Sequence, residues 1–135
     1  MSSFDEAVRA SVEYFANDDL AANVFVTKYA LTDRAGVLQE KTPDDMHHRL
    51  AREFYRIEST YPNPMSEQEI YELFKDFKYV IPQGSPMSGI GNPYQTQSIS
   101  NCFVIQSPYD SYGGILKADQ ELVQIAKRRG GVGFD

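Results

Sequence analysis

The chain contains a single cysteine, Cys102, and this scarcity excludes several classes of protein. One cysteine cannot form a disulfide within the chain, which favours the reducing cytosol over a secreted location. No apolar run approaches the ~18 residues that a membrane-spanning helix requires. The N-terminus, M-S-S-F-D-E-A-V, lacks the basic and then apolar layout of a signal peptide. We therefore expect a cytoplasmic protein that does not associate with a membrane.

The sequence also contains fewer basic than acidic residues. Lys and Arg number 13 against 19 Asp and Glu, so the net charge is -6 and the pI is about 4.9. This balance argues against a protein that coats nucleic acid, and we expect no direct DNA binding. The two histidines, His47 and His48, are adjacent and would point about 100° apart on a helix. We expect both on the surface, with no metal site.

The first part of the sequence has the patterns of a helical domain. Helical spacing of apolar residues and N-terminal caps predict helices that begin at Ser3, near Leu20, at Thr42-Pro43 and at Ser66. The third helix should reach about Glu58, because Met46, Leu50, Phe54 and Ile57 form one apolar stripe along it. We assign residues 1–80 to this domain.

The pattern changes after residue 78. Tyr79–Pro82 is β-like, and residues 83–98 form a long loop rich in Gly, Pro, Ser, Gln and Asn. The apolar run Ile99–Gln106 predicts a buried parallel strand. A helix should follow to about Arg129, with Gly130 as its C-cap, before a second strand begins in residues 131–134. Residues 81–135 thus predict the opening of a parallel α/β unit.

Such a unit cannot close a parallel sheet by itself. The apolar faces of Ile99–Ile105 would need partners that this sequence does not contain. We therefore expect a fragment that docks onto another polypeptide, or an artificial piece of a longer enzyme.

The residues that could carry chemistry each have an ordinary structural explanation. Cys102 on an apolar strand is typical of a buried free cysteine, and a redox role would need a second thiol. Asp110 and Ser111 precede a helix, where an N-cap explains them fully and is favoured over a sugar and phosphate site. The basic run 127–129 complements a helix C-terminus, although the glycines after it would also let phosphate approach the backbone. It is not a P-loop.

The order of four motifs is more specific than any one of them. The sequence reads P-Q-G-S-P-M-S-G-I-G at 82–91, S-N-C-F-V-I at 100–105, D-S-Y-G-G-I at 110–115 and K-R-R-G-G-V-G-F-D at 127–135. In this order the motifs resemble the catalytic subunit of ribonucleotide reductase, most of all the adenosylcobalamin-dependent class II enzymes. Lys28–Leu31 and Thr42–Met46 are similar to the N-terminal helical domain of that family.

The resemblance implies a fold and a set of site residues. The fold would be the N-terminal helical domain, followed by the first strand–helix unit of a ten-stranded α/β barrel completed by another chain. Cys102 matches the cysteine of the first barrel strand, which becomes oxidised to a disulfide during reduction of the ribose. Substrate contacts match Ser85, Ser100, Asn101 and Gly131. Asp110 and Ser111 match the start of the site for a dNTP or ATP effector, and the 112–129 helix matches an element of the dimer interface.

The same resemblance shows what this sequence does not contain. The thiyl-radical cysteine, the partner of the redox pair and most cobalamin contacts lie downstream of the matched region in that family. Adenosylcobalamin and a thioredoxin-type reductant would therefore act mainly through the missing part. An N-terminal cone for activity control is not expected. The sequence leaves open the source of the radical, the choice between diphosphate and triphosphate substrates, and a different class of function, a non-catalytic nucleotide-binding module that dimerises through the 112–129 helix.

Overall fold

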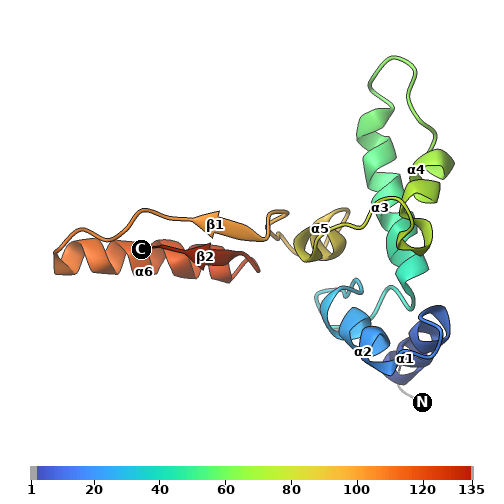
Figure 1. Ribbon diagram of the computed structural model, residues 1–135, viewed down its shortest axis with the longest axis horizontal. Helices are drawn as coiled ribbons and strands as arrows, with labels where there is room; N and C mark the ends of the chain where they lie inside the picture. Colours follow the sequence, from blue (N-terminus) through green and yellow to red (C-terminus); the bar gives the residue numbers. More distant parts are fainter. Residues whose placement is uncertain (1–2, 135) are drawn as a thin grey trace.

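A computed structural model describes residues 3–134, and within this range it contains six α-helices, one 3-10 helix and a two-stranded parallel sheet (Figure 1). The chain is a mixed, mainly helical protein. The elements in chain order are α1 Ser3–Tyr14, α2 Asp19–Lys28, α3 Pro43–Glu58, α4 Glu67–Phe74, η1 Lys75–Phe77, α5 Gly84–Gly89, β1 Cys102–Val104, α6 Tyr112–Ala126 and β2 Gly131–Gly133. No helix in residues 3–134 is long and apolar enough to cross a bilayer.

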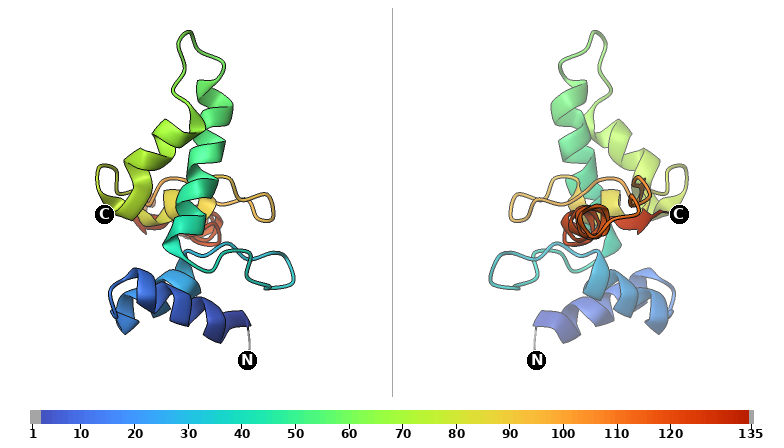
Figure 2. Two further views of the ribbon diagram at one scale, coloured as in Figure 1. Left: turned by 90° about the vertical axis from the view of Figure 1, so that its right-hand side faces the viewer. Right: turned by 90° about the vertical axis from the view of Figure 1, so that its left-hand side faces the viewer.

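The core lies among the first four helices. Helix α1 packs on α2, and α4 packs alongside α3, with the α1–α2 pair near the N-terminal end of α3 (Figure 2). Buried apolar side chains from all four helices meet there: Ala7, Phe25, Val26, Met46, Leu50, Ala51, Ile70, Tyr71 and Phe74. Burial of this set removes apolar surface from water and stabilises the helical part.

Local capping explains where these helices begin. The Thr42 side chain accepts a hydrogen bond from the backbone of Asp45, whose carboxylate accepts one in return, and Ser66 and Glu69 repeat this arrangement. The capping box at Ser66 and the hydroxyl cap at Thr42 were predicted from the sequence, and α3 spans the residues predicted for it. Helix α2 begins slightly earlier than expected, because Asp18 accepts a hydrogen bond from the Ala21 N–H at 2.9 Å.

One prediction about α3 is wrong. His47 is not a surface residue: it is 0% exposed, and its ring contacts Phe77 edge-on at a centroid distance of 4.6 Å. Only His48 is accessible, stacked on Tyr71. Phe54 and Ile57 continue the apolar stripe, but they lie beyond the core and remain exposed. The stripe reaches the core only along the first half of the helix.

The segment between the helical part and β1 also differs from its prediction. Tyr79–Pro82 forms no strand, because the described residues offer it no partner strand. The stretch predicted as a long loop contains helix α5, whose Ser88 hydroxyl bonds back to the carbonyl oxygen of Gly84 at 3.2 Å. The glycine, proline and serine residues of this stretch had favoured the prediction of a loop.

The C-terminal strands pair in parallel through α6, as predicted for an α/β unit. Cys102 lies opposite Gly131, Phe103 opposite Val132 and Val104 opposite Gly133. Together with α6 they form an arm that extends away from the four-helix part (Figure 1). Strand β1 is shorter than predicted and is not buried on both faces: Val104 is 90% exposed. Within residues 3–134, α6 covers the face of the sheet that carries Phe103, and the opposite face is uncovered.

Gly130 has a different role from the predicted C-cap. The cap of α6 is Lys127, and the residue in the left-handed region is Arg129, with φ of 66°. At Gly130 a Cβ would lie 2.5 Å from Cγ2 of Ile125 and 2.8 Å from Cε2 of Phe103. Glycine is required there so that the chain can pass closely between α6 and β1.

Candidate functional site

A pocket of about 460 Å³ lies where the helical part meets the arm. The end of α2, the start of α5, the residue before β1 and the turn after α6 all contribute to its wall. Its lining residues are Thr27, Lys28, Tyr29, Gly84, Ser85, Ser88, Asn101 and Arg129. The volume falls within the ~300–1,000 Å³ of small-molecule sites, and the lining is rich in hydrogen-bonding groups.

Asn101 ties three of these segments together. Its side-chain oxygen accepts a hydrogen bond from the Ser85 N–H at 2.8 Å, and its carbonyl oxygen accepts one from the Gly131 N–H at 2.7 Å. A Cβ on Gly131 would lie 3.2 Å from that same carbonyl oxygen, so a side chain there would crowd the contact. Three residues predicted as substrate contacts, Ser85, Asn101 and Gly131, are thus brought together, with two of them lining the pocket.

A fourth predicted contact, Ser100, is not in this group. It is exposed and engaged with its own neighbourhood: its N–H donates to the Ser98 hydroxyl at 3.1 Å, and its carbonyl oxygen accepts from that hydroxyl at 2.8 Å. Ser100 therefore shapes the turn before β1.

The pocket is cationic. Among its lining residues the charged ones are Lys28 and Arg129, and neither forms an ion pair with a carboxylate of residues 3–134. Arg129 Nη1 donates a hydrogen bond to the carbonyl oxygen of Lys28 at 3.1 Å, linking the arm to the end of α2. The whole chain carries a net charge of -6, so the charge at this pocket is opposite in sign to that of the chain.

A buried ion pair between Arg49 and Glu40 holds two walls of the pocket in place, and the sequence did not predict it. Arg49 Nη2 donates to the carbonyl oxygen of Met87 in α5 at 2.7 Å, and Nη1 donates to that of Ile90. Its partner Glu40 accepts a hydrogen bond from the Leu31 N–H, just after α2, at 2.9 Å. The pair thereby fixes α5 relative to the end of α2. Charged residues nine positions apart, one of them outside any helix, carry no periodic signal that would identify them.

Cys102 directly follows the pocket residue Asn101 in the sequence. Its side chain lies on the face of the sheet that α6 does not cover. Side chains alternate along a strand, so Cys102 and Val104 project away from the face that Phe103 shares with α6. The thiol is free, and its residue is exposed. The expectation of a buried cysteine is therefore wrong for the described residues: Cys102 is accessible.

Asp110 and Ser111 lie away from the pocket. The Ser111 hydroxyl accepts a hydrogen bond from the Gly114 N–H at 3.0 Å, so its predicted role as a cap of α6 is confirmed. Asp110 is exposed, and the described residues show no hydrogen bond or ion pair to its carboxylate. Helix α6 extends from these residues toward Arg129, a length of roughly 22 Å at about 1.5 Å per residue.

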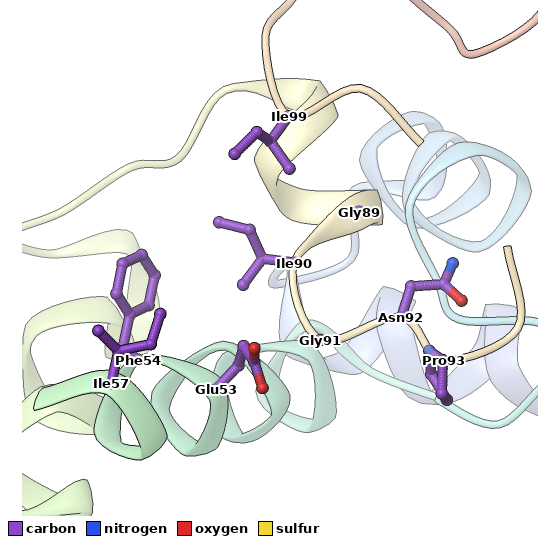
Figure 3. Close-up of a pocket in the computed structure, with 9 residues that line it drawn as sticks. All are labelled: Glu53, Phe54, Ile57, Gly89, Ile90, Gly91, Asn92, Pro93 and Ile99. Atoms are coloured by element: carbon purple, nitrogen blue, oxygen red, sulfur yellow. The ribbon is translucent and has the colours of Figure 1, made fainter. Parts of the chain in front are cut away.

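A second hollow of about 560 Å³ lies between α3 and the segment around α5 (Figure 3). Phe54 and Ile57 line it from α3, and Ile90 and Ile99 line it from the other side. Glu53 provides a carboxylate at its edge, already paired with Arg56 at 2.7 Å. With an apolar lining and a negative rim, this hollow does not match a phosphorylated ligand.

No group of three or more His, Cys, Asp or Glu in residues 3–134 is placed to hold a metal ion. The rings of His47 and His48 pack on Phe77 and Tyr71, respectively, within the helical part.

A scan of protein-family models and a search of curated proteins found no match to this chain.

Proposed function

We propose that the chain is the N-terminal part of a ribonucleotide reductase, which converts ribonucleotides to deoxyribonucleotides by radical chemistry. One observation supports this more than any other. Ser85, Asn101 and Gly131 belong to three separate stretches of sequence, and the resemblance assigns all three to substrate. In the structure they are joined by hydrogen bonds beside one pocket, directly before the strand of Cys102.

Cys102 would supply one of the two thiols consumed in the reaction. A radical removes the 3′ hydrogen of the ribose and returns it at the end of the reaction, and the 2′ hydroxyl leaves as water. Two thiols provide two electrons and two protons, become a disulfide, and leave a deoxyribonucleotide. Because Cys102 is the one cysteine in the sequence, its partner thiol must come from another polypeptide segment. Exposure on the open face of the sheet is the placement that this pairing needs.

The completing segment would build on the arm. Within residues 3–134 the outer edges of β1 and β2 are unpaired, and Val104 lies exposed beside Cys102. We propose that further strands extend this pair into the ten-stranded barrel, carrying the radical cysteine and the contacts to adenosylcobalamin. A thioredoxin-type protein would reduce the disulfide after each turnover.

Regulation and location complete the proposal. Asp110 and Ser111 would begin the site for a dNTP or ATP effector, at the far end of α6 from the pocket. Helix α6 would contribute to a dimer interface. The cytoplasm is the proposed location, on the sequence grounds of a single cysteine.

The experiment begins with native mass spectrometry of the protein purified from its own source. A complex of this 15.3 kDa chain with a larger polypeptide is expected, and bound cobalamin in it would support class II. Ribonucleotide reduction by that complex should be abolished by Cys102→Ser and retained by Ser107→Ala, a control on an exposed residue of the same segment. Full turnover by the serine variant, with external thiols excluded, would refute the role of Cys102.

A second candidate is a non-catalytic nucleotide-binding module. The observation that favours it is that the cationic pocket is formed by this chain without any partner. Submicromolar binding of a deoxynucleotide by the isolated chain, with no larger polypeptide in the native complex, would support this function over the reductase.

A further inference from the structure

We infer that Lys28 and Arg129 form the phosphate subsite of the pocket, a deepening that rests on the proposed nucleotide substrate. The two cations come from opposite parts of the chain, Lys28 from the end of α2 and Arg129 from the turn after α6. Both line the same pocket, and no carboxylate lines it with them. Their charges are therefore available to an anionic ligand.

The guanidinium of Arg129 is oriented but not saturated. Its bond to the Lys28 carbonyl oxygen, at 3.1 Å, is the one hydrogen bond that it makes within residues 3–134. A guanidinium carries five N–H donors in a planar fork, so most of them stay available, and the fork matches the oxygens of a phosphate. The main-chain bond restricts the side chain before a ligand arrives, which lowers the entropy cost of binding.

The neighbouring groups suit the rest of a nucleotide better than its phosphates. The Ser85 and Asn101 side chains also line the pocket, and the hydrogen bond from the Ser85 N–H to the Asn101 side-chain oxygen joins the two residues. A ligand with phosphates at Lys28 and Arg129 would present its sugar toward these hydroxyl and amide groups. The substrate class selected by this arrangement is a ribonucleotide with at least one free phosphate.

The basic run that contains Arg129 provides a matched control. Arg128 is adjacent and equally cationic, but its Nη1 donates to the Gln124 carbonyl oxygen of α6 at 3.2 Å and it does not line the pocket. Lys28→Gln tests the charge of the subsite without breaking the contact between the arm and α2. It removes a charge and leaves the main-chain oxygen that accepts the Arg129 hydrogen bond, so the arm stays joined to α2.

The test is isothermal titration calorimetry on the full chain, alone and with the polypeptide that completes it. The probes are a ribonucleoside, its monophosphate, diphosphate and triphosphate, and inorganic pyrophosphate. Affinity should rise with the number of phosphates. Lys28→Gln and Arg129→Gln should each weaken binding of the diphosphate about ten- to a hundredfold, the loss of one charged hydrogen bond, while Arg128→Gln binds as wild type. The unphosphorylated nucleoside should bind all four proteins alike.

Each departure from this pattern has a separate meaning. If phosphates strengthen binding but both pocket variants bind as wild type, the subsite is wrong and the nucleotide pocket stands. If pyrophosphate binding depends on Lys28 and Arg129 but the ribose and base add nothing to affinity, the subsite stands and the proposed nucleotide function fails. If neither pyrophosphate nor any nucleotide binds, the subsite is overturned.

Discussion

Glu40 and Arg49 form a buried ion pair, with Arg49 Nε 2.6 Å from Glu40 Oε1. Neither residue is in the apolar core, yet both lie beneath the surface, between the end of α2 and helix α5. Every hydrogen bond of this pair to the backbone reaches a segment that borders the candidate pocket or continues from it. The pair is therefore the connection between the helical part and the site.

Removal of Arg49 should be one of the most costly single changes in the chain. Arg49→Met leaves the Glu40 carboxylate buried without its cation, a change that typically costs about 3–5 kcal/mol. It also leaves the carbonyl oxygens of Met87 and Ile90 without their donor. Urea unfolding followed by circular dichroism should show this loss.

Arg56 provides the control for that measurement. It pairs with Glu53 at 2.7 Å on the solvent-exposed surface of the same helix, and Arg56→Met should change stability far less, since exposed pairs contribute little. The double variant Glu40→Leu/Arg49→Met should recover much of the loss, because no charge is then left buried. Equal destabilisation by Arg49→Met and Arg56→Met would contradict the role of the buried pair.

Local signals were sufficient for the longer helices, but not for the short helix α5 or for the contacts between helices. The capping boxes at Thr42 and Ser66 were predictable because all their partners lie within three residues. His47 was not, because its burial depends on Phe77 and Tyr14 from other helices. The meeting of Ser85 with Asn101 follows from tertiary geometry that no periodicity encodes, and it was anticipated only through the family resemblance.

Gly130 is a position where the structure predicts intolerance to a single methyl group. Gly130→Ala places Cβ within 3 Å of side-chain atoms of both Ile125 and Phe103, so the packing between α6 and β1 must shift. We expect about 1–3 kcal/mol of destabilisation from this overpacking. Gly133→Ala is the matched control, since a Cβ there has no neighbour among the described residues within 4 Å. Hydrogen exchange at the β1 and β2 amides should accelerate in the first variant and not in the second.

Helix α6 exposes an apolar stripe on the side away from the sheet. Tyr112, Leu116 and Val123 recur at helical spacing on this side, while Ala118 faces the strands. If this stripe forms the proposed dimer interface, Leu116→Glu should shift the protein toward monomer in sedimentation equilibrium, with an unchanged circular dichroism spectrum. Gln124→Glu adds the same charge beside the stripe and should leave association unchanged. Dimers of equal stability in both variants would exclude α6 from the interface.

His47 should make the stability of the helical part depend on pH in the neutral range. The residue is fully buried, and neither ring nitrogen has a hydrogen-bond partner among residues 3–134. Burial lowers its pKa below the ordinary value of 6.5, and nearby His48 acts in the same direction, while the Asp44 and Asp76 carboxylates oppose the shift. The unfolded chain therefore takes up a proton that the folded chain excludes.

The sign of the effect follows from that difference. Stability is fully present above pH 6.5 and declines as the pH falls below it, by at most about 1.4 kcal/mol per pH unit for one proton, until the folded pKa is reached. Urea unfolding at a series of pH values between about 7.5 and 5.5, roughly the range in which histidine alone titrates, measures this slope. His47→Phe should flatten it, because the ring contact with Phe77 remains and the titrating group is gone. His48→Gln removes the exposed neighbour and should retain the slope; if it abolished the slope and His47→Phe did not, the exposed histidine would be the one that couples folding to protons.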